Sequence, residues 1–275
     1  MTSPPVDTVI VMSTGSPSSG RGRAIADRLR AAGSVFAEEE AAILLDSARD
    51  DAELASLVAR RVAGEPIEPL VGWVRFGPLR LGVGPGVFVP RQRSLLLARA
   101  AVRIVRAQDE PVVLEPFCGV APIAATVAAA VPMAEIHVTD VDPTPLRFAR
   151  RNLPSGAQVH QGAGLAHLPV ALRGRVSLAA SVPPYVPERE RHLVPREALE
   201  HEPPAALFAG ADGLDHVRDL VTGLAGWLRP DGRALIEVHW SQWSAAAEHA
   251  RAQGWRASRR TGSDGQTVLL DLRAG

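Results

Sequence analysis

Between residue 91 and the C-terminus, segments with helical periodicity alternate with short apolar runs typical of buried strands. Helices are expected in SLLLARAAVRIVRA, APIAATVAAAV, PTPLRFARRNL and GLDHVRDLVTGLAGWLR, and strands in PVVLEP, EIHVTD, RVSLAASVPPY and GRALIEVHW. The last segment, WRASRRTGSDGQTVLLDLR, is typical of two strands joined by a turn. The pattern therefore predicts an α/β domain over residues 91–275, with a mostly parallel sheet covered on both faces and an antiparallel hairpin at one edge.

The chain before residue 91 consists of three segments with different sequence patterns. Residues 21–64 repeat apolar positions at helical spacing and predict a small helical domain, which Gly64 and Pro66 end. Its buried face is expected to hold Phe36, Ile43, Leu44, Leu54, Leu57 and Val58. Residues 65–90 contain WVRFGPLRLGVGPGVFVP, whose alternation and glycine and proline residues predict a β-hairpin linker. Residues 1–20, rich in serine, proline and glycine, predict a flexible tail.

Composition narrows the class of protein. Thirty basic and thirty acidic residues give a formal net charge of zero, which argues against direct binding to nucleic acid or an anionic membrane, although a local basic patch stays open. The single cysteine, Cys118, excludes an internal disulfide, and no apolar run approaches a membrane span, so a cytoplasmic location is expected. The eight histidines show no metal-ligand spacing and are interpreted as surface or capping residues, so no metal site is expected.

Ligands of such sheets bind beyond the carboxyl ends of the strands. The first strand leads into LEPFCGVAP, where Gly119 lies in a turn before a helix; an ordinary strand-to-helix turn is an equal interpretation. Asp140 ends the second strand, about 20 residues further on, where a carboxylate can accept the hydroxyls of a ribose. Asp142 is instead expected to cap the next helix, with Pro143 at its first position, which leaves Asp140 free for the ligand.

Two further strands lead into distinctive loops. The third leads into VHQGAGLAHLP, where Ala163 offers no polar contact. The fourth ends in SVPPYVP, which contains Tyr185, the only tyrosine of the chain, behind two prolines. A simple Pro-Pro turn is the alternative interpretation of that step, and its place at a strand end makes this the less favoured one. Glu237, at the end of ALIEV, is interpreted as a strand-end carboxylate paired with an arginine.

Taken together, these loops resemble the protein N5-glutamine methyltransferases, the class I methyltransferase family that modifies release factors. RRVAGEPIEPLVGWVRFGPLRLGVGPGVFVPR resembles that family's linker and hairpin, PPYVP its substrate loop, and HEPPAALFAGADGLDHVRDL the segment that follows, which is the most distinctive match. The resemblance covers nearly the whole chain after the tail. It implies a Rossmann-like fold, the cofactor S-adenosylmethionine and methyl transfer to the amide nitrogen of a glutamine-like group.

The resemblance also implies which residues bind the cofactor, take part in catalysis and contact the substrate. The candidate cofactor-binding residues are Glu115, Phe117, Gly119, Asp140, Val141 and Ala163, with Glu115 and Gly119 beside the methionine part and Asp140 on the ribose. The candidate catalytic residues are Val182, Pro183, Pro184 and Tyr185, and the candidate substrate residues are Arg91 and Tyr185. In the family, the step is Asn-Pro-Pro-Tyr: the asparagine oxygen and the next carbonyl accept the two amide N–H bonds and so orient the nitrogen.

The sequence departs from this pattern at several positions. Val182 replaces the asparagine, Phe117 replaces a small or glycine residue, Ala163 replaces a polar one, and Arg93 and Leu95 replace acids. Three hypotheses follow. The chain is a methyltransferase of this family, acting on a protein substrate with a release-factor-like glutamine loop or on a small-molecule acceptor. Alternatively, it is a degenerate member that binds a protein partner, or a repurposed enzyme of specialised metabolism.

Overall fold

The computed structural model describes residues 20–274. The chain divides into two compact units, of which the first ends at Val71 and the second begins at Gly72. The tail predicted over residues 1–20 lies outside the described residues except for Gly20, where the first helix begins. Among residues 20–274, no helix combines the length and the apolar character that crossing a membrane requires. The predicted boundary at residue 64 lies in the turn after the third helix, and a short further helix still belongs to the first unit.

The first unit is helical, as its periodicity predicts. It consists of α1 (Gly20–Ala31), α2 (Ala37–Ser47), α3 (Asp51–Val62) and the short α4 (Ile67–Val71). Asp50 begins α3 as its N-cap, because its side chain accepts the N–H of Glu53. Leu44, Leu54, Leu57 and Val58 are buried as expected, and Ile43 is half-buried. Phe36 was wrongly assigned to this face: it precedes α2, outside the helical repeat, and is 66% exposed.

The second unit contains a small hairpin and a seven-stranded sheet. The hairpin pairs β1 (Trp73–Phe76) with β2 (Leu79–Gly82), so strand structure fills less of the 65–90 segment than its texture suggests. The sheet strands are β3 (Val112–Pro116), β4 (Glu135–Asp140), β5 (Gln158–Gln161), β6 (Val176–Ser181), β7 (Leu228–His239), β8 (Trp255–Thr261) and β9 (Thr267–Ala274).

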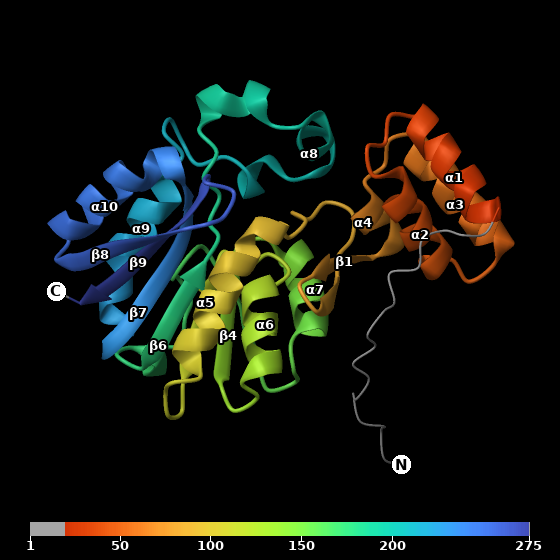
Figure 1. The fold of residues 1–275 in the computed structure, drawn as a ribbon. Coiled ribbons are helices and arrows are strands. Elements are labelled where there is room, and N and C mark those ends of the chain that lie inside the picture. The colour runs from red at the N-terminus through yellow and green to blue at the C-terminus, as the bar shows by residue number, and fades with distance from the viewer. Residues whose placement is uncertain (1–19, 275) are drawn as a thin grey trace, which may run out of the picture. The chain divides into compact units, whose positions relative to one another are not determined.

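The strand order is β5-β4-β3-β6-β7-β9-β8. Strands β3 to β7 are parallel, and β9 and β8 add an antiparallel edge, which confirms the predicted mostly parallel sheet with its edge hairpin (Figure 1). The order reverses between β3 and β6, so the carboxyl ends of these two strands flank the switch point where such folds bind ligands.

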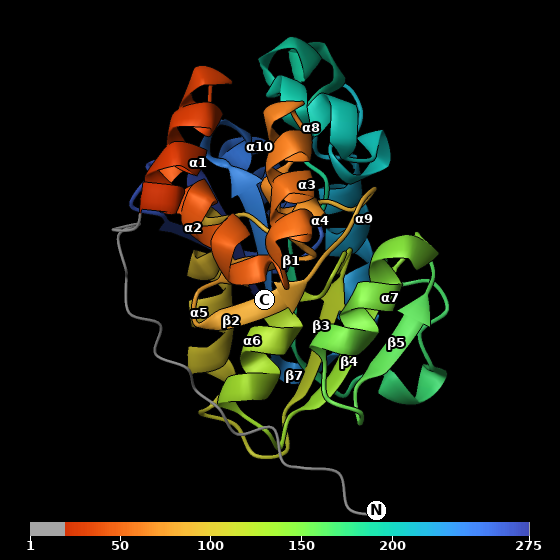
Figure 2. The same ribbon diagram turned by 90° about the vertical axis from the view of Figure 1, so that its right-hand side faces the viewer.

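Helices cover both faces of the sheet. One layer contains α5 (Leu95–Val105), α6 (Pro122–Ala130) and α7 (Pro143–Asn152), and Figure 2 shows α6 and α7 in front of the strands. The other layer contains α9 (Asp215–Gly223) and α10 (Trp243–Ala252). A short helix, α8 (Arg196–His201), lies in the long connection after β6. The sequence interpretation did not include α8 or α10.

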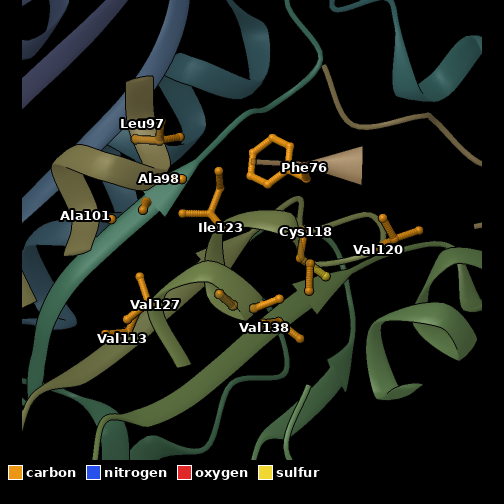
Figure 3. Packing of buried hydrophobic residues seen from close by; sticks show 14 of the residues in the cluster. Phe76, Leu97, Ala98, Ala101, Val113, Cys118, Val120, Ile123, Val127 and Val138 are labelled. Atoms are coloured by element: carbon orange, nitrogen blue, oxygen red, sulfur yellow. The ribbon is translucent and has the colours of Figure 1, made fainter. Parts of the chain in front are cut away.

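Two apolar clusters hold these layers together. The first joins α5, α6 and α7 to the sheet, and Phe76 of the hairpin enters it fully buried, near Leu97 and Ile123 (Figure 3). The second packs α9 and α10 on the opposite face. Burying these side chains is the main favourable term of folding, and it fixes the strand ends in space.

One histidine contradicts the assignment of all eight to surface or capping positions. His137 is 4% exposed and stacks on His160, with ring centroids 5.4 Å apart. Its Nε2 lies 2.9 Å from Oε1 of Glu135, so both ring nitrogens have partners. It lies in the buried run of β4, residues 136–139.

Candidate active site

The loop between β3 and α6 has an unusual backbone. Phe117, Gly119 and Ala121 all have positive φ, at 53°, 54° and 62°. Only glycine adopts this region freely, so Phe117 and Ala121 each store strain of about 1–2 kcal/mol. Such strain persists at functional sites because the surrounding structure imposes it. A Cβ atom added to Gly119 would meet nothing within 4 Å, so the middle of the loop faces open space.

Asp140 lies directly beside this loop. Its Oδ2 accepts the N–H of Gly119 at 2.8 Å, and its Oδ1 accepts the N–H of Asp142 at 3.0 Å. The carboxylate was expected to be free, but it already ties the ends of β3 and β4 together while remaining half-buried. Burial raises the pKa of Asp140 above its ordinary value. Asp142 is the N-cap of α7, as predicted: it accepts the N–H of Thr144 at 2.7 Å.

Glu115 has a structural partner that the sequence did not indicate. The residue is 2% exposed, and its two oxygens accept the N–H groups of Ile123 and Ala124 at 3.3 and 2.7 Å. It therefore caps the first turn of α6 from below the loop. Burial raises the pKa of Glu115 to about 8, because removal from water penalises the charged form.

The other candidate cofactor residues surround the same strand ends. The ring of Phe117 packs against His216 of α9, with centroids 4.9 Å apart, and lies 3.7 Å from where a Cβ of Gly164 would be. Its bulk is thus directed toward the second helical layer. Val141 is 59% exposed directly after Asp140, and Ala163 is exposed in the loop after β5. The candidates therefore line one edge of the sheet, at its parallel carboxyl ends.

The VPPY step follows β6 at the same edge. Ser181 is 1% exposed, and its hydroxyl donates to the carbonyl of Pro116 at 2.7 Å. That hydroxyl is committed to β3 and cannot replace the missing asparagine. Val182 is half-buried and packs against the first apolar cluster. The Pro183 carbonyl accepts no hydrogen bond from any residue in the described range 20–274, so one backbone acceptor remains available here.

Tyr185 belongs to a network around a buried carboxylate. Its hydroxyl donates to Oε1 of Glu237 at 3.4 Å, and the hydroxyl of Ser94 donates to the same atom at 3.1 Å. Arg93 Nε lies 3.7 Å from that oxygen, which confirms the arginine pairing expected of Glu237. Burial is the main cause of the raised pKa values of Glu237 and of Tyr185, the latter reaching about 12. Both groups therefore stay protonated to a higher pH than they would in water.

A second network holds the loop after Tyr185. Gln242 donates through Nε2 to the carbonyls of Tyr185 and Asp212, at 2.8 and 2.9 Å. Gly213 has φ of 76°, and a Cβ there would lie 2.1 Å from the Tyr185 carbonyl, so only glycine fits. Sequence reasoning missed Ser94 and Gln242. Only the family-like run that contains Asp212 and Gly213 pointed toward this contact.

Arg91 joins two segments that are distant in the sequence. Its guanidinium lies 2.6 Å from Glu202 and also stacks over the ring of Phe88 at 4.6 Å. Glu202, 8% exposed, also accepts the N–H of Val89 at 3.1 Å. The hairpin exit and the HEPPAAL segment are therefore fastened together, and the charge of Arg91 is largely used in that contact.

No group of three or more histidine, cysteine, aspartate or glutamate side chains within residues 20–274 has the arrangement to hold a metal ion. The polar groups described at the site are carboxylates, backbone groups and the Tyr185 hydroxyl. Its layout, with an acidic residue at two adjacent strand ends and an open glycine loop between them, is that of a site for a nucleoside-containing ligand.

Comparison with known proteins identifies methyltransferases that are similar to this chain. A release factor glutamine methyltransferase of Streptomyces coelicolor is 38% identical over 215 residues, 72% of this chain and 76% of that protein. A 4-amino-L-phenylalanine/4-methylamino-L-phenylalanine methyltransferase of Streptomyces pristinaespiralis is 36% identical over 217 residues, 76% of this chain and 74% of its own length. No protein-family model matches the chain.

Solved structures support the fold. A methyltransferase from Pyrococcus furiosus superposes with a TM-score of 0.50 at 15% identity, over 72% of this chain and 91% of that one. With the sequence relatives, this confirms the class I methyltransferase architecture inferred from the strand order. The chain therefore belongs to the release factor glutamine methyltransferase family, and it is an S-adenosylmethionine-dependent methyltransferase.

Proposed function

We propose that this methyltransferase acts on an amine nitrogen and that the acceptor is not the primary amide of a glutamine. The single observation that carries the proposal is Val182 beside the committed hydroxyl of Ser181. A primary amide brings two N–H bonds to the site, and an unpaired buried donor costs about 1–3 kcal/mol. The VPPY step offers the Pro183 carbonyl as an acceptor and no side-chain acceptor at residue 182.

The strand-end residues fit the cofactor of this family. Gly119 faces open space, so a ligand can approach the loop backbone closely. The half-buried Asp140 offers carboxylate lone pairs that can accept the hydroxyls of the ribose. We assign Asp140 and Gly119 to the nucleoside part and Glu115 to supporting the loop from beneath, since its oxygens are already bonded to α6. When bound, S-adenosylmethionine supplies an electrophilic methyl group.

The remaining residues orient the acceptor. The Pro183 carbonyl would accept one N–H of the acceptor, and the proline rings limit its movement. The half-buried Tyr185 ring, tethered through its hydroxyl to Glu237, would form a wall of the acceptor site. A secondary amine brings one N–H bond fewer than a primary amide, and the lone pair of an aromatic amine is less delocalised than that of an amide. Val182 then contributes apolar contact where an asparagine would hydrogen-bond.

One relative supports an amine acceptor directly. The Streptomyces pristinaespiralis protein is named for 4-amino-L-phenylalanine and 4-methylamino-L-phenylalanine, both of which carry an aromatic amine. Its similarity to this chain is close to that of the release factor enzymes. The family therefore includes small-molecule acceptors as well as protein ones.

The glutamine amide is the second candidate. The HEPPAALFAGADGLDHVRDL segment resembles the protein-modifying enzymes, and several relatives are named release factor glutamine methyltransferase. Retention of Pro183 and Tyr185 is compatible with it as well, because these two residues would surround the acceptor in either case. In that case, the missing side-chain acceptor at residue 182 predicts slow methylation of the glutamine amide and not a change of methyl acceptor.

The test compares acceptors under one set of conditions. Calorimetric titration with S-adenosylmethionine comes first, and micromolar binding is expected. Transfer of labelled methyl groups is then measured with 4-methylamino-L-phenylalanine, a secondary aromatic amine, and with a peptide that carries a Gly-Gly-Gln loop. A higher kcat/KM for the aromatic amine supports the proposal. Faster methylation of the peptide overturns it in favour of the glutamine amide, and absence of cofactor binding at millimolar concentration supports the partner-binding hypothesis.

A further inference from the structure

A basic surface lies on the sheet far from the acceptor step. On the α5 side of the sheet, Arg233 of β7 pairs across the strands with Arg273 of β9, which pairs with Arg256 of β8. Cross-strand partners point to the same face, so three guanidinium groups form one row across three strands. Like charges placed directly opposite each other destabilise a sheet, so this row needs a compensating reason.

Within residues 72–274, no helix packs on this part of the sheet. The α5 helix lies over β6 and β7, while α10 and α9 pack on the other face of β8 and β9. Figure 1 shows β7, β9 and β8 beside α5 with the two helices behind them. The exposed side of α5 adds Arg99, Arg103 and Arg106, whose spacing of four and three residues places them on one stripe.

An open depression of about 550 Å³ lies between the helix and the sheet. Its lining includes Arg103 of α5, Arg233 of β7, Arg260 of β8 and Asp231. Arg233 is level with Leu178 in the sheet, three residues before Ser181, so the depression lies about 10 Å along the strands from the VPPY step.

Acidic neighbours balance only part of this charge. Asp271, 2% exposed, pairs with both Arg233 and Arg260, and Asp231 lies 2.7 Å from Arg229. Arg103 forms no hydrogen bond or ion pair with any residue that the structure describes. The depression and its rim thus carry five arginines, at positions 103, 233, 256, 260 and 273, against two aspartates, in a chain whose formal net charge is zero.

Protection of an edge strand does not account for the arrangement. Charged side chains on an edge strand prevent aggregation, and that reason suffices for Arg256 and Arg260 on β8. Arg233 and Arg273 are on internal strands, however, and Arg103 is on a helix. The pair with the buried Asp271 accounts for Arg233, so Arg103 and Arg273 are left without such a reason.

We propose that Arg103, Arg233 and Arg260, with Arg256 and Arg273 at the rim, form a binding site for an anion that carries two or more phosphate groups. The excess of about three positive charges exceeds what one carboxylate neutralises, whereas each terminal phosphate brings about −1.5 to −2. The guanidinium fork also matches phosphate oxygens geometrically. The phosphates belong to a nucleotide or to a nucleic-acid backbone, and the site is independent of the proposed methyl acceptor.

The test uses defined probes on the full chain. Inorganic pyrophosphate and ADP are titrated calorimetrically, and a fluorescent single-stranded RNA of about ten nucleotides is followed by anisotropy. The variant Arg103→Gln/Arg256→Gln should bind pyrophosphate at least about tenfold more weakly, in line with the loss of two charge-assisted contacts. The control Arg23→Gln/Arg28→Gln removes the same charge from exposed positions of α1 and should change binding less than about twofold.

The results separate the two phosphate sources. ADP binding at least as tight as RNA binding assigns a nucleotide; tighter RNA binding with a steep salt dependence assigns a nucleic-acid backbone. Both variants should keep the wild-type melting temperature and S-adenosylmethionine affinity, since neither touches the strand-end loops. Equal loss in the two variants, no binding of any phosphate probe at millimolar concentration, or tighter binding of hexaglutamate than of pyrophosphate would overturn the proposal.

Discussion

The backbone N–H of Gly119 donates to Oδ2 of Asp140 at 2.8 Å, which ties the loop after β3 to the end of β4. This bond holds the loop in a conformation where Gly119 has positive φ and faces open space. Asp140 thus has two roles in the proposal: it positions the loop and it offers lone pairs to the ribose. Each role leads to a measurable expectation.

Replacing Asp140 should weaken cofactor binding. Asp140→Asn removes the charge that would accept the ribose hydroxyls, and hydrogen bonds to charged groups contribute about 1.5–3 kcal/mol, so calorimetry should show roughly 10- to 150-fold weaker binding of S-adenosylmethionine. The matched control is Asp142→Asn, because asparagine is as good an N-cap as aspartate. Equal affinities of the two variants would remove Asp140 from the cofactor site.

Gly119 and Gly265 allow strain to be separated from ligand contact. Both have positive φ and open space where a Cβ would lie, but Gly265 is in the turn between β8 and β9. Alanine at either position should lower the free energy of unfolding by about 1–2 kcal/mol, measured by urea titration. Only Gly119→Ala should also weaken S-adenosylmethionine binding. Identical affinities would show that nothing approaches the Gly119 backbone.

Val182→Asn should restore an amide acceptor. The new side-chain oxygen would satisfy one N–H of a glutamine amide, so methylation of the Gly-Gly-Gln peptide should rise by roughly 5- to 150-fold in kcat/KM, which corresponds to about 1–3 kcal/mol. Val182→Leu, of similar size but apolar, serves as the control and should leave the peptide rate unchanged. A rate increase in both variants, or in neither, would contradict the role assigned to residue 182.

Tyr185 should matter through its ring more than through its hydroxyl. Tyr185→Ala removes the proposed wall of the acceptor site and should lower kcat/KM at least about tenfold for any acceptor, through lost orientation. Tyr185→Phe keeps the ring and loses the hydroxyl, with its long contact of 3.4 Å to Glu237. It should retain most activity. Full activity of the alanine variant would place Tyr185 outside the site.

Glu115 should make stability fall as the pH rises. Its pKa is raised from 4.5 to about 8 in the folded protein, so the folded state holds the proton more tightly than the unfolded state. The contribution is complete below pH 4.5 and is lost toward pH 8, at up to about 1.4 kcal/mol per pH unit. Relative to Glu115→Gln, wild type should therefore lose free energy of unfolding between pH 5 and 8.

Glu135 serves as a control, because its contribution to the free energy of unfolding depends on pH in the opposite direction. His137 and then Arg175 hold its pKa below the ordinary value, against a partial opposing effect of burial. Its contribution is present above pH 4.5 and is lost as the pH falls through the lowered value. Glu135→Gln should therefore alter the stability profile only on the acid side. A wild-type profile that matches Glu115→Gln between pH 5 and 8 would show that Glu115 titrates normally.

Local sequence patterns were enough to predict most helices and strands and one helix cap. Alternating periodicities predicted the mostly parallel sheet and its edge hairpin, because side-chain period depends only on neighbouring residues. Asp142 was identified as the α7 cap because Asp-Pro before an amphipathic segment is a local signal. The same local logic placed Phe36 wrongly, since a helical repeat does not reveal where one helix ends and another begins.

By itself, then, the sequence determined the fold class, the family and the order in which Gly119, Asp140 and Tyr185 follow their strands. Only the tertiary structure decided that Glu115 supports α6, that Ser94 and Tyr185 share Glu237, and that arginines of β7, β8 and β9 align in one row. The physical reason is the same in each case. These contacts join residues far apart in the chain, and their geometry depends on strand register and burial, which no local pattern encodes.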